Sequence, residues 1–372
     1  PFFNDTATTE IYTAGHSSAA SDVYKRQGYA RATGKVGVAI ATSGPGATNT
    51  ITGIATAYMD SIPMVVITGQ VPTPLIGNDA FQEADVIGLT RPITKHSYLV
   101  RDIKDLAMTV KKAFYIARTG RPGPVVIDLP KDVQIAATKF EYPESVELRG
   151  YKPTFSGNMR MIDKAAKMIL SAKKPVLYVG GGASLTDAHS ELLELAERLQ
   201  APVTTTLMGM ASFPTQHELS LGMLGMHGTY YANMAVTNSD LLIALGARFD
   251  DRVTGKIALF CPNARIIHID VDPASISKTV RVDVPIVGQV RSVLHDMLRV
   301  LKEHPQKPDA DKLKTWWDRI DDWRNRDCLR YEQGADTIKP QYAVEAMYKD
   351  TKDSDFYLTS DVGQHQMFAA QF

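Results

Sequence analysis

The sequence predicts an α/β fold built from consecutive domains, each with a parallel β-sheet between layers of helices. Three observations predict this class. Short apolar runs typical of buried strands alternate with amphipathic helical segments along most of the chain, as in βαβ units. Glycine-rich turns follow several of the predicted strands, at the places where such units turn into helices. Two stretches rich in proline and charge separate the alternating segments and predict domain boundaries.

The composition of the 372 residues narrows the class of protein. Basic and acidic residues each number 41, so the formal net charge is zero, which argues against nucleic acid or an anionic membrane as the main partner. No apolar run approaches the roughly 18 residues of a membrane span, and the first residues do not form a signal peptide. The two cysteines lack CxxC spacing, which favours a reducing compartment.

The first 27 residues differ from the rest, because they are rich in Thr, Ser and Ala and show no helical or strand period. They predict a frayed terminus. From Gly28 onward a first α/β series is predicted, with strands at 36–41, 63–68 and 125–129 and helices at 51–58 and 102–119. Residues 138–157 carry prolines and mixed charge without a period, which is typical of a linker.

A second α/β series follows the linker. Its predicted helices are 159–171, 185–199 and 290–301, and its predicted strands are 175–179, 203–207, 241–245 and 266–270. The proline-rich stretch 304–308 marks another boundary, after which a tryptophan-rich helix is predicted. A third series begins with a helix at 341–348 and a strand at 356–360.

Two glycine-rich turns are candidate ligand sites. Ser43-Gly-Pro-Gly46 joins a strand to a helix at the carboxyl end of a parallel strand, where open α/β sheets bind ligands. Its glycines permit positive φ and close backbone approach, although a plain tight turn has the same residues. Gly180-Gly-Gly182 is a second turn of this kind, and Asp270 ends a strand where a carboxylate can bind a ribose hydroxyl. Together they favour a nucleotide-type cofactor in the middle domain.

Other candidates have structural explanations of similar weight. Gln82 lies in a long loop and can donate hydrogen bonds to a developing oxyanion. The charges of 248–252 follow a strand and form either an anion site or a solvated, salt-bridged loop. His227 lies among methionines typical of adaptable packing, and His365 follows a predicted strand, where it suits a phosphate contact. HExxH, GxSxG and Walker A patterns are absent, so metalloprotease, α/β-hydrolase and P-loop NTPase have no support.

Longer motifs occur together and in a fixed order. They are Gly28-Tyr-Ala-Arg-Ala-Thr-Gly-Lys-Val-Gly37, Thr42-Ser-Gly-Pro-Gly-Ala-Thr-Asn49, Asp79-Ala-Phe-Gln-Glu83, Gly120-Arg-Pro-Gly-Pro124, Gly246-Ala-Arg-Phe-Asp-Asp-Arg-Val-Thr-Gly255 and Asp361-Val-Gly-Gln-His-Gln-Met367. With these motifs the chain resembles, from Gly28 to Phe372, the catalytic large subunits of acetolactate synthase (acetohydroxyacid synthase). Those proteins are thiamine diphosphate enzymes.

The resemblance implies a three-domain enzyme that uses thiamine diphosphate, Mg²⁺ and FAD. It decarboxylates pyruvate and joins the two-carbon unit to a second 2-oxoacid, giving 2-acetolactate or 2-aceto-2-hydroxybutyrate for isoleucine, valine and leucine synthesis. The implied domains are a pyrimidine-binding domain (28–150), a central FAD-binding Rossmann-like domain (151–308), a linker helix (309–334) and the start of a diphosphate-binding domain (335–372). Residues 1–27 lie outside the family, so the chain is expected to be truncated at both ends.

The resemblance also implies roles for individual residues. Gln82 lies near the reacting carbonyl with Phe81 as its pocket neighbour, Arg252 receives the carboxylate of the second oxoacid, and Lys131 lies at the substrate channel. The implied FAD contacts are Arg121, Gly180, Gly181, His227, Gly246, Arg248, Asp250, Asp270 and Gln289, and the implied diphosphate contacts are Gln364 and His365. Gln289 departs from the family's aspartate.

One departure concerns the start of the reaction. The family glutamate that protonates the aminopyrimidine falls at Ala19, and alanine cannot exchange a proton. The metal motif is expected beyond Phe372, so no metal ligand is predicted. We therefore expect this chain to be inactive alone, with residues 1–27 foreign to the gene.

The implied partners are small-molecule 2-oxoacids, a second copy of the chain across the active site, and a regulatory small subunit, without nucleic acid or membrane. The expected location is the bacterial cytoplasm, or a plastid or mitochondrion in a eukaryote. Two alternatives remain. One is another thiamine diphosphate carboligase such as glyoxylate carboligase, and the other is a non-catalytic flavin- or nucleotide-binding module.

Overall fold

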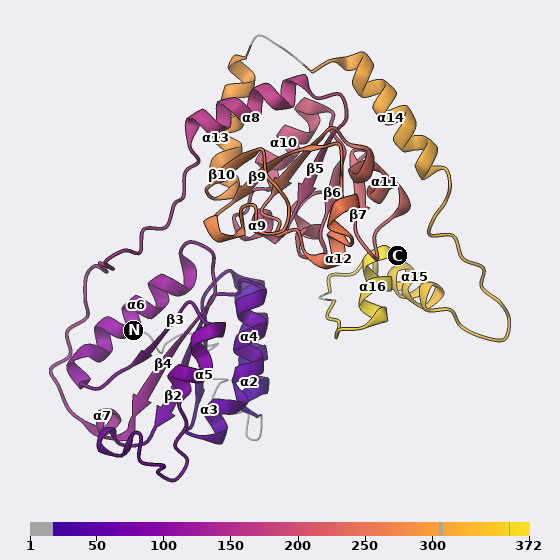
Figure 1. The fold of residues 1–372 in the computed structure, drawn as a ribbon. Helices are drawn as coiled ribbons and strands as arrows, with labels where there is room; N and C mark the ends of the chain where they lie inside the picture. The colour runs from indigo at the N-terminus through magenta and orange to yellow at the C-terminus, as the bar shows by residue number, and fades with distance from the viewer. Residues whose placement is uncertain (1–17, 305–307, 357) are drawn as a thin grey trace. The chain divides into compact units, whose positions relative to one another are not determined.

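The computed structural model describes residues 18–304, 308–356 and 358–372. The chain divides into two compact units, with the division between Pro153 and Thr154. Each unit contains one sheet, and every strand pair in both sheets is parallel (Figure 1). The predicted α/β class is therefore confirmed. Among the described residues, no helix combines the length and the apolar character needed to cross a membrane.

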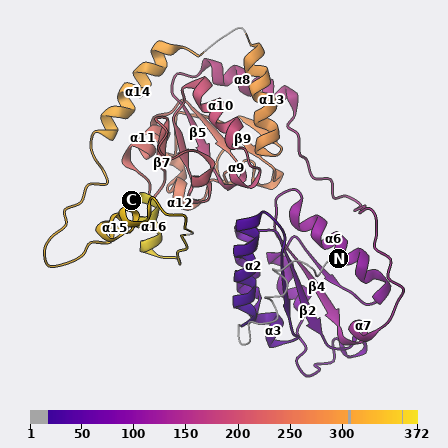
Figure 2. The same ribbon diagram turned by 180° about the vertical axis from the view of Figure 1, so that it is seen from behind.

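The first unit is a three-layer domain. Its sheet has the order β1-β2-β4-β3, formed by β1 (Gly37–Ala41), β2 (Met64–Gln70), β3 (His96–Leu99) and β4 (Pro124–Pro130). α2 (Ala19–Thr33) and α4 (Ile51–Met59) cover one face, and α6 (Leu106–Arg118) covers the other (Figures 1 and 2). Successive residues of each strand face opposite layers, so Met64 and Val66 pack in one core and Val65 in the other.

The predicted boundary between residues 27 and 28 falls inside a helix. Ser18 caps α2, and the helix continues without a break from Ala19 to Thr33. Val23 is buried against Gly53 of α4, where a Cβ would lie 2.7 Å from a Val23 methyl, so the two helices pack closely through a glycine. Gln27 is also buried and donates from Nε2 to the Gly53 carbonyl at 2.7 Å. Because small residues make this contact, the sequence of the helix shows no clear helical repeat of large apolar side chains. The prediction for residues 1–17 lies outside the described residues.

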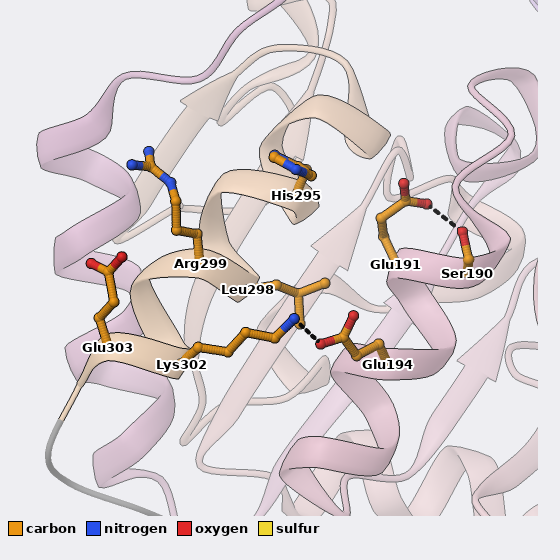
Figure 3. Close-up of a pocket in the computed structure, with 8 residues that line it drawn as sticks. All are labelled: Ser190, Glu191, Glu194, His295, Leu298, Arg299, Lys302 and Glu303. Carbon is orange, nitrogen blue, oxygen red and sulfur yellow. Dashed lines mark hydrogen bonds and ion pairs between the residues drawn. The ribbon is translucent and has the colours of Figure 1, made fainter.

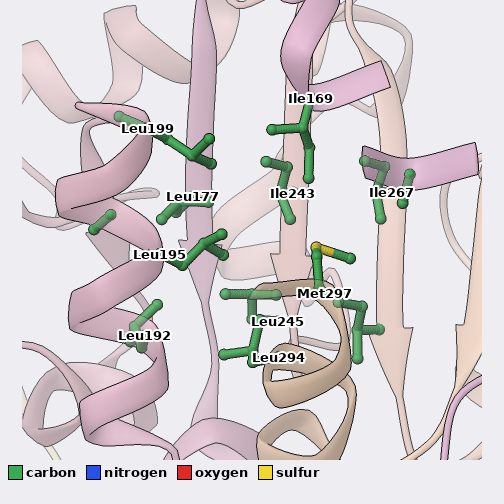
Figure 4. Close-up of a cluster of buried hydrophobic side chains, with 14 of the residues drawn as sticks. Ile169, Leu177, Leu192, Leu195, Leu199, Ile243, Leu245, Ile267, Leu294 and Met297 are labelled. Atoms are coloured by element: carbon green, nitrogen blue, oxygen red, sulfur yellow. The ribbon is translucent and has the colours of Figure 1, made fainter. Parts of the chain in front are cut away.

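The second unit has six strands in the order β10-β9-β8-β5-β6-β7. They are β5 (Pro175–Val179), β6 (Val203–Thr205), β7 (Ser220–Met223), β8 (Leu241–Leu245), β9 (Arg265–Asp270) and β10 (Val284–Val287). α8 (Met159–Ser171), α10 (His189–Leu199) and α13 (Val290–Glu303) cover one face, and Figure 4 shows the aliphatic core beneath them. α11 (Tyr230–Asn238) and α14 (Ala310–Arg324) cover the other face.

Several elements differ from the predictions. β7, β10, β3 and α11 were not predicted, and β10 contains Pro285, which an edge strand tolerates because its ladder needs fewer amide donors. The predicted strand at 356–360 is wrong for its described residues, which lie beside no strand that would pair with them. The segment predicted as a linker helix is α14, and its Trp316 is buried in the core of the second unit. α15 (Pro340–Thr351) and α16 (Gln364–Gln371) follow.

Candidate functional site

Most of the predicted site residues follow strands at the carboxyl edge of one of the two parallel sheets. In the first unit, the Ser43–Gly46 turn follows β1, the loop 77–84 follows β2, and Lys131 begins α7 (Lys131–Ile135) directly after β4. In the second unit, the corresponding residues lie after β5, β7, β8, β9 and β10. Because carboxyl ends of parallel strands share one edge, each sheet gathers its candidates there.

The Ser43–Gly46 turn and the Gln82 loop lie against each other. Gly44 has φ +61°, and a Cβ at this position would lie 2.7 Å from the Gln82 carbonyl oxygen. A side chain here would therefore clash with the backbone of the loop as well as strain its own. The structure thus brings together two motifs that are 38 residues apart in sequence.

The loop itself is folded around a carboxylate. Glu83 accepts hydrogen bonds from the amides of Gly77 and Ala80, the latter at 2.9 Å, and these bonds hold the pKa of Glu83 below its usual range. Gln82 has φ +58°, a left-handed conformation that is rare for a residue with a side chain. Phe81 is 89% exposed and Gln82 is exposed as well, so the loop presents both side chains to solvent.

Below this loop lies a buried carboxyl group that sequence analysis missed. Asp128 in β4 is 1% exposed, and it accepts hydrogen bonds from Thr68 Oγ1 at 2.7 Å and Gln70 Nε2 at 2.9 Å. Burial raises the pKa of Asp128 to about 6, against the effect of these two hydrogen bonds, and the nearby charge of Asp85 raises it further. The available signal was an aspartate inside the otherwise apolar run Val125-Val-Ile-Asp-Leu129.

The raised pKa of Asp128 predicts how pH affects the stability of the first unit. The folded unit binds the proton more tightly than the unfolded chain, so this stabilisation is present below about pH 4 and is lost as pH rises through 6. Asp128→Asn removes the ionisation, since an amide keeps a similar shape and one oxygen acceptor. We expect the free energy of unfolding of the variant, relative to that of wild type, to rise by roughly 2–3 kcal/mol between pH 4 and pH 8. Hydrogen exchange of β4 amides at the two pH values measures this, and equal pH dependence in both proteins would contradict it.

The remaining candidates of the first unit lie in different places. Arg121 donates to Ser61 Oγ at 2.9 Å and to the carbonyl of Tyr58, in the turns that precede β4 and β2. It therefore lies at the amino edge of the sheet, at the opposite end from Gln82. Ala19 is the first residue of α2, and the Ser18 hydroxyl before it accepts from the amide of Ser21 at 3.2 Å. Lys131 is exposed.

In the second unit, two glycine turns pack backbone against backbone. The amide of Gly182 donates to the Gly246 carbonyl at 3.1 Å, and that of Gly180 donates to the Leu245 carbonyl at 2.9 Å. Gly246 has φ +61°, and a Cβ there would lie 2.6 Å from the Gly182 Cα. The turns after β5 and β8 therefore require glycine for their close approach. A Cβ on Gly181 would lie 3.2 Å from the Met208 Cβ and 3.5 Å from the Met208 carbonyl oxygen.

The charged segment after β8 lies beside the His227 loop. Asp250 caps α12 (Asp251–Thr254) by accepting from the Arg252 amide at 3.0 Å, and it lies 3.7 Å from the Arg248 guanidinium. Arg248 and Asp250 are both exposed, so their ion pair adds little stability. The amide of Met226 donates to the Arg252 carbonyl at 2.8 Å, which places the His227 loop against α12. The Arg252 guanidinium is exposed and has no hydrogen-bond or ion-pair partner in the described parts of the chain.

Asp270 and Gln289 are also brought together. The Asp270 carboxylate accepts from the Asp272 amide at 2.8 Å, and its carbonyl accepts from the Gly288 amide at 3.0 Å. Gln289 follows directly, before α13, and its amide donates to the Phe155 carbonyl at 2.9 Å. Gln364 and His365 begin α16, whose Gln371 donates to the His227 carbonyl at 2.6 Å.

Two further polar groups lie buried in the second sheet and were not predicted. The hydroxyl of Tyr178 and Nδ1 of His268 have no hydrogen-bond partner among residues 18–304, 308–356 and 358–372. Phe249, at φ +55°, packs its ring 5.4 Å from that of Tyr178 and 5.1 Å from that of His268. Burial raises the pKa of Tyr178, so its hydroxyl stays protonated.

A surface pocket of about 430 Å³ lies elsewhere, between α10 and α13. Figure 3 shows that charged side chains of both signs line it, and Lys302 pairs with Glu194 across it at 2.6 Å. It belongs to the helical layer, away from the carboxyl edge of the sheet, so it is no candidate for the predicted cofactor. In the described parts of the chain, no group of three or more His, Cys, Asp or Glu residues is arranged to hold a metal ion.

Comparison with protein families matches two models. Residues 7–89 match the "Thiamine pyrophosphate enzyme, N-terminal TPP binding domain", and residues 162–297 match the "Thiamine pyrophosphate enzyme, central domain". The first match begins at residue 7, so much of the segment 1–27 lies inside the matched range. The two models together account for parts of both structural units.

Comparison with curated proteins finds long matches to acetolactate synthase large subunits. The chain is 52% identical to the isozyme 3 large subunit of Escherichia coli over 378 aligned positions, covering 98% of this chain and 66% of that protein. It is 54% identical to the Haemophilus influenzae large subunit (95% and 62%) and 51% identical to the Corynebacterium glutamicum large subunit (93% and 55%). The chain thus spans less than two thirds of the length of these relatives.

Proposed function

The chain belongs to the thiamine pyrophosphate enzyme family, and from that premise we propose that it forms the N-terminal and central domains of an acetolactate synthase large subunit. The similarity that carries this proposal covers 98% of the chain at 52% identity, and so includes the loops at both sheet edges. The proposed reaction joins two pyruvate molecules, with uptake of one proton, to give 2-acetolactate and carbon dioxide. It is redox-neutral.

In the first unit, Gln82 is the proposed contact to the reacting carbonyl. Its amide is exposed on a loop that Glu83 folds and that packs against Gly44, so its backbone is held in place before substrate arrives. A preorganised N–H donor stabilises negative charge that develops on a carbonyl oxygen. Phe81, exposed beside it, is proposed to shield that oxygen from water.

In the second unit, Arg252 is the proposed receptor for the carboxylate of the second 2-oxoacid. Its guanidinium is exposed and has no partner in the described parts of the chain, so it is available to an anion. A planar guanidinium binds a carboxylate through two parallel hydrogen bonds, which fixes the orientation of the acid. Substrates with a charged carboxylate beside the ketone would therefore be preferred over aldehydes.

We propose that the carboxyl edge of the second sheet binds an extended dinucleotide such as FAD. The proposed contacts follow five strands, from Gly180 and Gly181 to Gln289, along one edge, and the close packing of Gly246 on Gly182 supports the proposal because these two turns carry no side chain at their point of contact. FAD supplies electron-transfer chemistry when it is bound. Because the proposed reaction is redox-neutral and requires no electron transfer, we propose that this chain binds FAD without using its redox chemistry. Arg121 lies at the amino edge of the first sheet, and its flavin contact is proposed from the family resemblance alone.

The matches to two thiamine pyrophosphate enzyme domains support thiamine diphosphate as a cofactor, and two features bear on the steps that can be derived for it. Ala19 offers a methyl group where the family has a carboxylate, and the described residues contain no metal-binding cluster. We therefore derive no proton transfer on the thiamine and no metal-dependent step; Gln364 and His365 remain proposed diphosphate contacts. One second candidate is a flavin-binding module without catalytic activity, and it is favoured only by Ala19, whose methyl group cannot exchange the aminopyrimidine proton.

A substitution at Arg252 tests the proposal. In a holoenzyme whose chain carries the family glutamate at position 19 and the family's complete diphosphate-binding domain, with thiamine diphosphate, Mg²⁺ and FAD, Arg252→Ala is expected to lower kcat/KM for acetolactate formation roughly 10–100-fold, because a hydrogen-bonded charge contributes about 1.5–3 kcal/mol. Lys256→Ala, a neighbouring exposed cation, is the control and should stay within twofold of wild type.

The outcomes separate the two candidates. Flavin absorbance without acetolactate formation, even in the chain with both ends restored to the family pattern, would contradict the carboligase proposal and support the flavin-binding module. Glyoxylate turnover in place of pyruvate turnover would instead indicate glyoxylate carboligase. We also propose a homodimer, as the family resemblance implies, and a regulatory small subunit as a further partner. The proposed location is a reducing compartment such as the cytoplasm, which suits two free thiols.

A further inference from the structure

We propose that Asp128 is a positioning residue for Gln82: it fixes the orientation of the Gln70 amide, and Gln70 ties the Gln82 loop to the sheet. The structural part concerns only contacts within the first unit. Its catalytic meaning rests on the proposed function, in which Gln82 contacts the substrate. Asp128 itself is buried below the loop and touches no substrate.

The first step is the orientation of Gln70. A glutamine amide has an accepting end and a donating end, and an ionised carboxylate only accepts. Asp128 Oδ2 lies 2.9 Å from Gln70 Nε2, so the carboxylate selects the orientation in which the NH₂ group faces it. Gln70 Oε1 then faces the amide of Val71 and accepts from it at 2.8 Å. Both ends of the buried side chain are satisfied in this one orientation.

The second step connects Gln70 to the loop. The second hydrogen of the same NH₂ group donates to the carbonyl of Ala84 at 2.8 Å, two residues after Gln82. A reversed amide would place Oε1 against this carbonyl, and two acceptors repel. Asp128 therefore controls a hydrogen bond that it does not make. The path runs from β4 through β2 to the end of the loop.

The third step is the need for this restraint. Gln82 holds φ +58°, which is unfavourable for a residue with a Cβ, so the surrounding contacts must stabilise it. The Glu83 carboxylate bonds only to amides of the loop itself, so it would move with the loop. The bond from Gln70 to Ala84, by contrast, joins the loop to a buried strand. Loss of this bond would release the loop as a unit.

Thr68 provides a matched comparison. Its hydroxyl donates to the other oxygen of Asp128 at 2.7 Å, in a buried position like that of Gln70, but within the described residues it forms no hydrogen bond with the loop. If Asp128 only stabilises the fold, removing the Thr68 hydroxyl and removing the Gln70 amide should have similar effects on the mobility of the loop. A positioning role predicts that only the Gln70 side affects the loop.

The test compares Gln70→Met, Thr68→Val, Asp128→Asn and Asp128→Leu with wild type by hydrogen exchange of the amides in 77–84. Gln70→Met is expected to raise exchange of this segment at least tenfold, and so is Asp128→Leu, which removes the acceptor that faces the Gln70 NH₂ group. Thr68→Val should leave it within twofold, and so should Asp128→Asn, whose oxygen accepts from Gln70 and whose nitrogen donates to Thr68. No loosening by Asp128→Leu would overturn the positioning role of Asp128. Exchange of β2 and β4 amides in each variant verifies that the sheet remains folded.

Equal loosening by Gln70→Met and Thr68→Val, or no loosening by Gln70→Met, would overturn the proposal. If Gln70→Met unfolds the unit, Gln70→Glu is the replacement: it repels Asp128, and its effect on the loop should decrease as pH falls through 6. In active holoenzyme, Gln70→Met should lower kcat at least tenfold with KM for pyruvate changed less than threefold. The expected exchange pattern without acetolactate formation in wild type would uphold the positioning role and reject the proposed function alone.

Discussion

Replacing Gly246 by alanine is expected to destabilise the second unit by roughly 2–5 kcal/mol. Two effects add. The left-handed φ of +61° costs a residue with a Cβ about 1–2 kcal/mol, and the new Cβ would lie 2.6 Å from the Gly182 Cα, in the backbone of the neighbouring turn. Overpacking against a rigid neighbour costs about 1–3 kcal/mol more. Urea unfolding followed by tryptophan fluorescence measures this, since all three tryptophans lie in the second unit.

Gly255→Ala is the matched control for this substitution. Gly255 has φ +53°, also left-handed, but no heavy atom lies within 4 Å of the position a Cβ would take. It should therefore lose only the conformational contribution, about 1–2 kcal/mol. Equal destabilisation by the two substitutions would mean that the turns after β5 and β8 can move apart, and the close approach described here would not be a requirement. The same result would weaken the fit of this edge to a dinucleotide.

The strands and helices that were predicted most accurately from the sequence are those whose own residues form a clear apolar pattern. α8, β5 and β8 begin and end where the apolar patterns predicted, because buried parallel strands and strongly amphipathic helices need little outside information. α2 shows the opposite case, since its packing depends on Gly53 of another helix. β10 was missed because its proline is acceptable only at an edge, and strand order cannot be read from sequence.

The same distinction holds for the candidate site. Glycine-rich turns after apolar runs predicted positions at the carboxyl edges, and the structure places Gly44, Gly180 and Gly246 there in tight backbone contacts. The Asp128 network could not be predicted, because it joins side chains 58 and 60 residues apart that meet only when β2 pairs with β4. Arg121 lies at the amino edge of its sheet, at the opposite end from Gln82. The residues of its motif do not indicate at which end of a strand the motif will lie.

The tryptophan-rich helix α14 covers one face of the second sheet, which a linker would not do. Trp316 is 2% exposed, packs edge to face on Trp323 with ring centroids 5.8 Å apart, and donates from Nε1 to the Pro175 carbonyl at the start of β5. Its core neighbours include Val176 and Leu242, which belong to strands in the middle of the sheet. α14 therefore contributes to the stability of the central domain, although it lies after the boundary predicted at 308.

Trp316→Ala is accordingly expected to lower the free energy of unfolding of the second unit by roughly 3–5 kcal/mol, the usual cost of removing a buried tryptophan. Trp317→Ala is the control on the next residue: that side chain is only half-buried and donates to the Gln200 carbonyl at 2.8 Å, so about 1–2 kcal/mol should be lost. Urea unfolding followed by circular dichroism suits both variants, because each removes a fluorophore. If Trp316→Ala costs no more than Trp317→Ala, α14 is a dispensable cover and the central domain ends before it. A large difference places the domain boundary after α14, because the sheet then depends on a helix from beyond residue 308 for its second core.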